Sequence, residues 1–186
     1  MRYKPGQKEE TRKKITEAAG RTFKRCGYSG VGVDGLAKEA GVTSGAFYGH
    51  FKSKEEAFKQ AISAGMGDLA SAIAEYKNTY GDDWWDKFAD FYTLDKRVCD
   101  LSQSCALQSM TPEVGRSNES IRQLFSEELL KVVETANGKE DRDKVWVRLA
   151  MLIGGVTLAR AVGEDALALQ IAEAVNKEVK AISRQS

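Results

Sequence analysis

The stretch of sequence that decides the fold spans residues 33–56 and reads VDGLAKEAGVTSGAFYGHFKSKEE. Its first part predicts a short helix with three inward-facing apolar residues at helical spacing, namely Leu36, Ala37 and Ala40. Gly41 then permits a tight turn, and Phe47 and Phe51 direct the following short helix toward the same interior. The stretch therefore predicts a helix-turn-helix.

The outward face of the second helix carries the residues that point to a function. Four of them are small or able to form hydrogen bonds: Ser44, Gly45, Ala46 and Tyr48. A helix over residues 44–50 is roughly 10 Å long, which suits a major groove about 12 Å wide. Thr43 is a candidate N-cap of this helix and a candidate DNA contact, and residues 53–56 form a capping box that opens the next helix. His50, Lys52 and Lys54 follow directly, so we expect this segment to contact DNA.

The rest of the chain also shows helical spacing of apolar residues. The predicted segments cover residues 11–26, 54–80, 84–92, 117–137, 143–162 and 167–182. No segment alternates with a period of two, so we predict an all-α protein of about nine helices. We expect a three-helix DNA-binding domain over residues 1–53 and a helical effector-binding and dimerisation domain over residues 54–186.

Residues 30–35 spell the string Gly-x-Gly-x-x-Gly, which in other contexts binds dinucleotides. That function requires the glycines to lie between a strand and a helix. Here a predicted helix precedes them and Gly35 falls inside the next one, so we reject nucleotide binding.

Charge and composition narrow the classes of protein further. The 28 Lys and Arg nearly balance the 27 Asp and Glu, but residues 1–60 hold 13 of the basic and 7 of the acidic residues. This asymmetry favours a polyanionic partner for the N-terminal part. The apolar run 149–159 is too short to span a bilayer. Three cysteines without paired spacing indicate a reducing compartment. We expect a cytoplasmic protein with no membrane segment, metal or cofactor.

The motifs resemble the N-terminal signature of TetR-family transcriptional regulators. The matching residues include Gly27-Tyr28, Val33 to Ala37 and above all Ala40 to Glu55, with the string Tyr-x-His-Phe-x-Ser-Lys at positions 48–54. Val31-Gly32 differs from the Thr-Ser pair of many members, so a hydroxyl that would cap the helix is absent. More weakly, Cys105-Ala106-Leu107 and residues 158–161 resemble one subgroup of the family.

The resemblance implies a homodimer that binds a pseudo-palindromic double-stranded DNA operator. It also implies that a small-molecule effector, bound in the C-terminal domain, changes operator affinity. On this basis Ser44, Gly45 and Ala46 lie nearest the bases, and three residues hold phosphates: Tyr48, His50 and Lys54. We therefore expect a ligand- or redox-responsive repressor.

Two other classes of function compete with this interpretation. An enzyme that uses histidine would have to use His50, the sole histidine, which lies within the predicted DNA-binding segment. A helical interaction module would leave the cluster of Tyr48, His50 and Lys54 unexplained. We therefore predict no enzymatic activity.

The effector domain has an aromatic stripe and a cysteine with two interpretations each. Trp84, Trp85, Phe88, Phe91 and Tyr92 form either plain core or the wall of an effector pocket. Cys105 is either a buried apolar residue or, because it opens a helix whose amides lower a thiol pKa, a sensor. Cys99 would then be its resolving partner, whereas Cys26 is expected on the inner face of the first helix.

The segment 143–162 is apolar on nearly every face. A helix of this kind is buried in a large core or shared with a partner. Because a fully buried helix is unusual in so small a domain, we predict a homodimer interface over residues 143–184, with a four-helix bundle across the two-fold axis.

Overall fold

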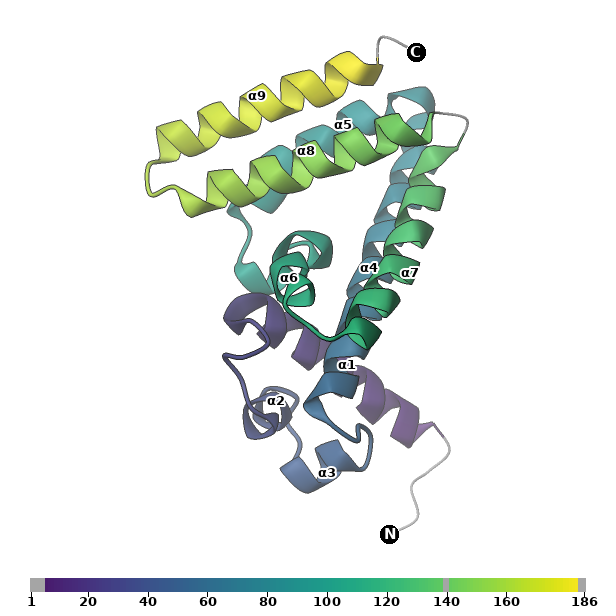
Figure 1. The fold of residues 1–186 in the computed structure, drawn as a ribbon, viewed down its shortest axis with the longest axis vertical. Coiled ribbons are helices and arrows are strands. Elements are labelled where there is room, and N and C mark those ends of the chain that lie inside the picture. Colours follow the sequence, from purple (N-terminus) through teal and green to yellow (C-terminus); the bar gives the residue numbers. More distant parts are fainter. Residues whose placement is uncertain (1–5, 139–140, 184–186) are drawn as a thin grey trace.

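The computed structural model of the chain describes residues 6–138 and 141–183, and all regular structure in these two ranges is helical (Figure 1). The described residues form nine α-helices and two short 3-10 helices: α1 Gln7–Cys26, α2 Val33–Glu39, α3 Ser44–Tyr48, α4 Lys54–Tyr80, η1 Gly81–Asp83, α5 Trp84–Val98, η2 Leu101–Gln103, α6 Ala106–Gly115, α7 Glu119–Asn137, α8 Arg142–Ala161 and α9 Asp165–Ser183. The predicted all-α fold is confirmed.

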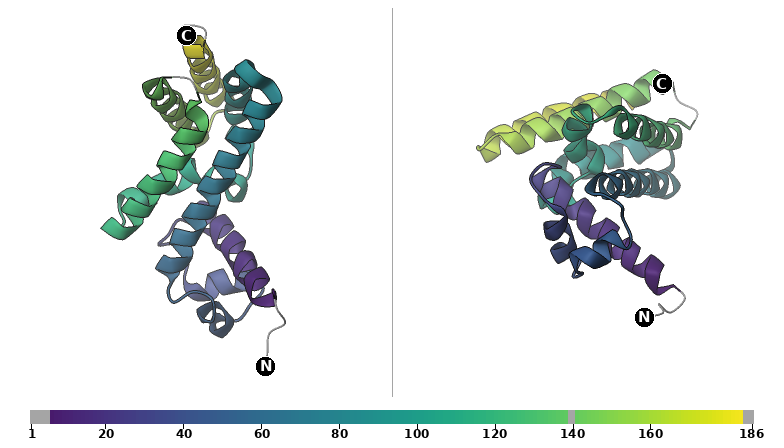
Figure 2. Two further views of the ribbon diagram at one scale, coloured as in Figure 1. Left: turned by 90° about the vertical axis from the view of Figure 1, so that its right-hand side faces the viewer. Right: turned by 60° about the horizontal axis from the view of Figure 1, so that its bottom comes forward.

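Helices α1, α2 and α3 form one end of the molecule, and α9 lies at the opposite end (Figure 2). The interior of the three-helix end is aromatic: Phe23, Phe47, Phe51 and Phe58 are each no more than 1% exposed. Leu36 and Ala37 are buried beside them, as their spacing predicted, and Ala40 is half-buried. At the turn between α2 and α3, Gly41 has a φ of +68°, which side chains disfavour. The predicted helix-turn-helix is therefore present.

Helices α4 and α7 lie side by side and connect the three-helix end to the rest of the molecule (Figure 1). Their starts are joined, because Asn118 Nδ2 donates a hydrogen bond of 3.0 Å to Glu55 Oε2. Helix α6 approaches α4 closely at Gly65, where an added Cβ would lie 2.4 Å from the Cβ of Ala106. The position of α6 therefore depends on a glycine in α4.

Helices α5, α8 and α9 pack together at the far end. The inner face of α8 is buried, and its residues repeat every three or four positions: Val145, Arg148, Leu149, Leu152, Gly155, Val156 and Ala159. The guanidinium of Arg148 lies 4.9 Å from the centroid of the Trp85 ring. No helix in the described ranges is long and apolar enough to cross a membrane.

Some sequence-based details differ from the structure. Helix α3 ends at Tyr48 rather than at residue 50, because the chain turns at Gly49. Cys26 is exposed, so its expected inner position in α1 is wrong. It is the last residue of α1, and the inner face of that helix ends at Phe23. Residues 30–35 connect α1 to α2 and enter α2, and no strand occurs in the described residues.

Candidate nucleic-acid interface and effector cavity

Helix α3 is held rigidly on its inner side and is open on its outer side. Thr43 caps it, since Thr43 Oγ1 accepts a hydrogen bond of 3.1 Å from Ala46 N. Phe47 is completely buried, whereas Tyr48 is 57% exposed. Thr43 and Gly45 are also exposed, and Ser44 and Ala46 are half-buried. The outer face thus consists of small groups around one projecting phenol.

Ser44 has a second contact that its sequence position did not predict. Its hydroxyl donates a hydrogen bond of 2.5 Å to Asp34 Oδ1, which joins α3 to α2. The lone pairs of the hydroxyl oxygen stay available as acceptors. The N-terminus of α2 itself has no side-chain cap, as expected from Gly32 at that position.

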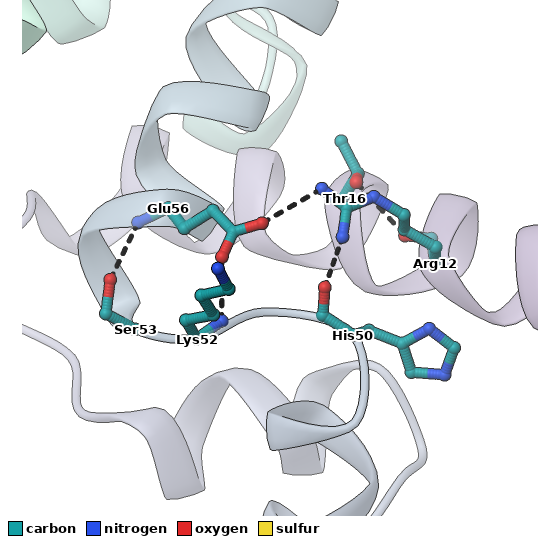
Figure 3. Close-up of polar contacts among 6 residues, drawn as sticks. All are labelled: Arg12, Thr16, His50, Lys52, Ser53 and Glu56. Carbon is teal, nitrogen blue, oxygen red and sulfur yellow. Dashed lines mark hydrogen bonds and ion pairs between the residues drawn. The ribbon is translucent and has the colours of Figure 1, made fainter.

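The turn between α3 and α4 is fixed by Arg12 of α1 and Glu56 of α4 (Figure 3). Arg12 Nη1 donates to the carbonyl oxygen of His50, and Arg12 Nη2 donates to Glu56 Oε1 at 3.2 Å. Glu56 Oε2 accepts a hydrogen bond of 2.7 Å from Lys52 N. We call these two side chains, with the backbone of His50 and Lys52, the Arg12–Glu56 clasp.

The clasp modifies the predicted capping box. Ser53 Oγ accepts from Glu56 N at 3.1 Å, as predicted, but Glu56 returns its bond to Lys52 N rather than to Ser53 N. The hydrogen bond from Lys52 N lowers the pKa of Glu56, and Arg12 lowers it further, against the opposing effect of burial. The Arg12 guanidinium also lies 4.2 Å from the centroid of the Phe51 ring, so the clasp rests on the aromatic interior.

The side chain of His50 lies beside this clasp, and its ring is directed away from Glu56 (Figure 3). Burial lowers the pKa of His50, and the charges of Lys8 and Arg12 lower it further. Its Nδ1 is buried and has no hydrogen-bond partner. The positive charges of Lys8 and Arg12 therefore act at the end of α3, and the sequence analysis did not single out Lys8.

The side chain of Lys54 forms contacts within the protein. Its ammonium donates to the carbonyl oxygens of Tyr28 at 3.1 Å and Val31 at 3.2 Å. The ammonium nitrogen also lies 4.2 Å from the centroid of the Tyr28 ring. Lys54 thus ties the start of α4 to the loop between α1 and α2, a structural role that the sequence analysis missed when it assigned this residue to phosphate alone.

A cavity of about 210 Å³ lies where α1, α4, α5 and α6 meet. Of the predicted effector residues, Phe88, Tyr92 and Cys105 line it. Trp84 and Trp85 do not: they stack on each other with ring centroids 4.1 Å apart and are buried in the core. The predicted aromatic stripe is therefore divided, because successive turns of α5 face either the core or the cavity. The sequence analysis also missed Lys24 and Lys96 in the cavity wall.

Cys105 is the residue directly before α6, as predicted, and it is 9% exposed. The buried hydroxyl of Tyr92 is close to it, and burial together with this thiol raises the pKa of Tyr92 well above its ordinary value. Cys99 Sγ donates to the carbonyl oxygen of Lys96 at 3.3 Å. Arg160 Nη2 donates to the Cys99 carbonyl at 2.8 Å, so α8 fixes the irregular segment that leads to Cys105.

The outer face of α8 carries apolar residues that the chain itself does not cover. Val147 is 48% exposed and Leu158 is 61% exposed. Ala150 and Gly154 lie between them on the same face and are exposed. Helix α9 packs beside α8 and adds the exposed Leu167. Helix α8 thus has apolar residues on nearly every face because one face packs in the core and another apolar face is exposed to solvent.

The fold and this surface define an all-α protein with an N-terminal helix-turn-helix. Residues 15–61 match the family described as bacterial regulatory proteins, tetR family. The chain is 35% identical over 75 residues to the HTH-type transcriptional regulator AcrR of Shigella flexneri, an alignment that covers 40% of this chain and 35% of AcrR. It is 41% identical over 56 residues to the regulator SrpR of Pseudomonas putida, which covers 30% of this chain and 26% of SrpR.

Solved structures resemble the whole chain. The reduced form of Escherichia coli NemR superposes with a TM-score of 0.75 at 19% identity, covering 92% of this chain and 95% of NemR. The fatty acid degradation regulator FadR of Bacillus halodurans superposes with a TM-score of 0.70 at 18% identity, covering 96% of each chain. The alignments to AcrR and SrpR span only about a third and a quarter of those proteins. Residues 15–61 therefore match the tetR family by sequence, and the chain shares its fold with NemR and FadR along nearly its whole length.

Proposed function

We propose that this protein is a dimeric, effector-responsive transcriptional regulator that represses from a pseudo-palindromic DNA operator. The observation that carries the proposal is the open face of α3, where Phe47 is sealed inside and Tyr48 projects outward. Small residues on this face let the helix backbone approach base edges in the major groove.

We assign roles to the individual residues on the basis of their positions on and around α3. Ser44, Gly45 and Ala46 meet the bases, and Thr43 and Tyr48 contact phosphates on either side. Lys8 supplies positive charge at the end of α3, and a phosphate bound there would favour the protonated form of His50. Lys54 contributes charge nearby while it holds the loop between α1 and α2.

The test is selection of bound duplexes from a random DNA library, followed by affinity measurements at several salt concentrations. We expect an enriched palindrome whose half-sites are about 34–36 Å apart or a multiple of that distance. Affinity should fall steeply with salt, because phosphate contacts release counterions. A library that shows no enrichment would refute the proposal.

Dimerisation is assigned to the outer faces of α8 and α9, within residues 143–184. Exposed apolar residues in a continuous stripe are typical of a surface that a partner covers, and a second copy related by a two-fold axis would bury the stripe against itself. Pairing of α8 and α9 with their copies gives a four-helix bundle.

A redox response through Cys105 is a second candidate, favoured by the position of this thiol before α6 and beside a cavity. One structural neighbour, NemR, was solved in a reduced form, so the redox state is a property to compare. Treatment of the DNA complex with a mild electrophile tests this candidate. Release from the parent but not from Cys105→Ser supports a sensor, and equal behaviour of the two proteins refutes it.

A further inference from the structure

The cavity between the two parts of the molecule has an unusual charge at its wall. Lys24 comes from α1, in the helix-turn-helix part, and it faces residues of α4, α5 and the segment before α6. The ammonium of Lys24 is half-buried and forms no hydrogen bond or ion pair with any residue in the described ranges. Burial lowers its pKa. A cation in this position is poorly solvated and has no direct counterion.

The other charges around the cavity leave a net positive wall. Asp68 of α4 faces Lys24 without forming an ion pair, and its charge opposes the effect of burial on Lys24. Lys96 of α5 donates to the carbonyl oxygen of Gln103 at 2.9 Å and keeps further N–H groups free for a ligand. Two lysines therefore face the cavity against one carboxylate, which matches a ligand of single negative charge better than a polyanion.

The remaining wall is apolar and aromatic. Leu69, Phe88 and Phe91 contribute to it. The Lys96 ammonium lies 5.5 Å from the centroid of the Phe91 ring, so cationic and aromatic surfaces meet there. Tyr92 is 3% exposed and lines the cavity, and its buried hydroxyl has the Cys105 thiol as its polar neighbour and no other hydrogen-bond partner. A buried hydroxyl of this kind is stabilised by any ligand oxygen that reaches it.

We propose that this cavity binds a small organic acid, with its carboxylate on Lys24 and a planar apolar body against Leu69, Phe88 and Phe91. The inference rests on the proposed function, since it names the chemical class of the effector. It also assigns a route for regulation. Lys24 belongs to α1, whereas Lys96 and the aromatic rings belong to α5, so a ligand held by both fixes the helix-turn-helix part relative to the effector domain.

The experiment compares three aromatic carboxylates (benzoate, phenylacetate and 3-phenylpropionate) with their neutral amides of the same shape. Binding to the full-length protein without DNA is measured by isothermal titration calorimetry. At least one carboxylate should bind roughly tenfold or more tightly than its amide, because a charge-assisted hydrogen bond is lost in the amide. Equal binding of acid and amide, or binding of none of the acids, overturns the proposal.

Two variants locate the site. Lys24→Met should weaken the binding of the carboxylate to the level of the amide, whereas Lys131→Met, on the exposed side of α7, should leave it unchanged. Unchanged binding by Lys24→Met overturns the assignment of the carboxylate to that lysine. The acid–amide comparison uses the unmodified protein, so it decides the ligand class even if a variant fails to fold.

A separate measurement of DNA affinity with and without the carboxylate distinguishes the two levels of the proposal. Binding without any change in DNA affinity would leave the site standing and remove its effector role. Binding with release of DNA supports both.

Discussion

The Arg12–Glu56 clasp gives the sharpest prediction, because it links the start of α1 to the turn that follows α3. The perturbation is Glu56→Gln, which keeps an acceptor for Lys52 N but removes the negative charge. A hydrogen bond to a charged group contributes about 1.5–3 kcal/mol and a neutral one about 0.5–1.5 kcal/mol, so the loss is about 1 kcal/mol at this bond. The side chains of Arg12 and Glu56 are 38% and 37% exposed, so solvent screening limits the contribution of their ion pair to stability to roughly a few tenths of a kcal/mol.

Glu56→Gln should therefore lower the free energy of unfolding by about 1–1.5 kcal/mol, and two assays should detect this loss. Thermal unfolding should show a midpoint lowered by roughly 2–6 °C for a chain of this size. If the loosened turn must be ordered again on DNA, affinity for the operator found by selection should fall about fivefold to tenfold. Arg12→Met should produce a similar change, and the double variant should lose less than the sum of the two, because the residues are in contact.

The dependence of the effect on pH identifies the charge as its cause. The pKa of Glu56 is lower in the folded protein than its ordinary value of 4.5. Its contribution to the free energy of unfolding is fully present above that value and is lost as pH falls through the lowered pKa. The stability difference between the parent and Glu56→Gln should therefore shrink below about pH 4.5.

The control is Glu128→Gln on α7, which removes a carboxylate paired with Lys131 at 3.1 Å but touches nothing near α3. It should leave DNA affinity unchanged. The reasoning is refuted if Glu56→Gln and Glu128→Gln behave alike in both assays, or if the effect of Glu56→Gln persists unchanged at pH 3.

Four further predictions concern other parts of the molecule. Lys54→Met should lower the free energy of unfolding by about 1–3 kcal/mol in chemical denaturation, because the Lys54 ammonium donates to two backbone carbonyls. Tyr48→Phe should weaken DNA binding without changing the free energy of unfolding. The affinity of the parent for DNA should rise as pH falls from 8 to 6, because a nearby phosphate raises the lowered pKa of His50, so that binding takes up a proton. The free protein should become less stable over the lower part of this pH range. The affinity of His50→Gln should depend less on pH. Leu158→Glu should give monomers in sedimentation at micromolar concentration with an unchanged helical circular dichroism spectrum, and a variant that still forms dimers contradicts the assigned interface.

The sequence by itself determined the helix-turn-helix, because its signals are local. Thr43 caps α3 and Ser53 caps α4 through hydrogen bonds to amides only three residues away. Gly41 has the positive φ that the tight turn requires. Phe47 and Phe51, four residues apart, are in tilted ring contact with centroids 5.5 Å apart. Features of this kind depend on neighbours along the chain, so a single sequence records them.

The tertiary structure alone decided how helices distant in the sequence face one another. Arg12 meets Glu56 across 44 residues, and Arg160 meets Cys99 across 61. Periodicity records which side of a helix is apolar, but the rotation and crossing of two packed helices determine which polar side chains on their borders meet. For this reason the clasp, the internal role of Lys54 and the position of Lys24 in the cavity wall could not be predicted. Position along α5 left Trp84 and Trp85 away from the cavity while Phe88, one turn further on, lines it, and the packing of α8 left Leu158 exposed.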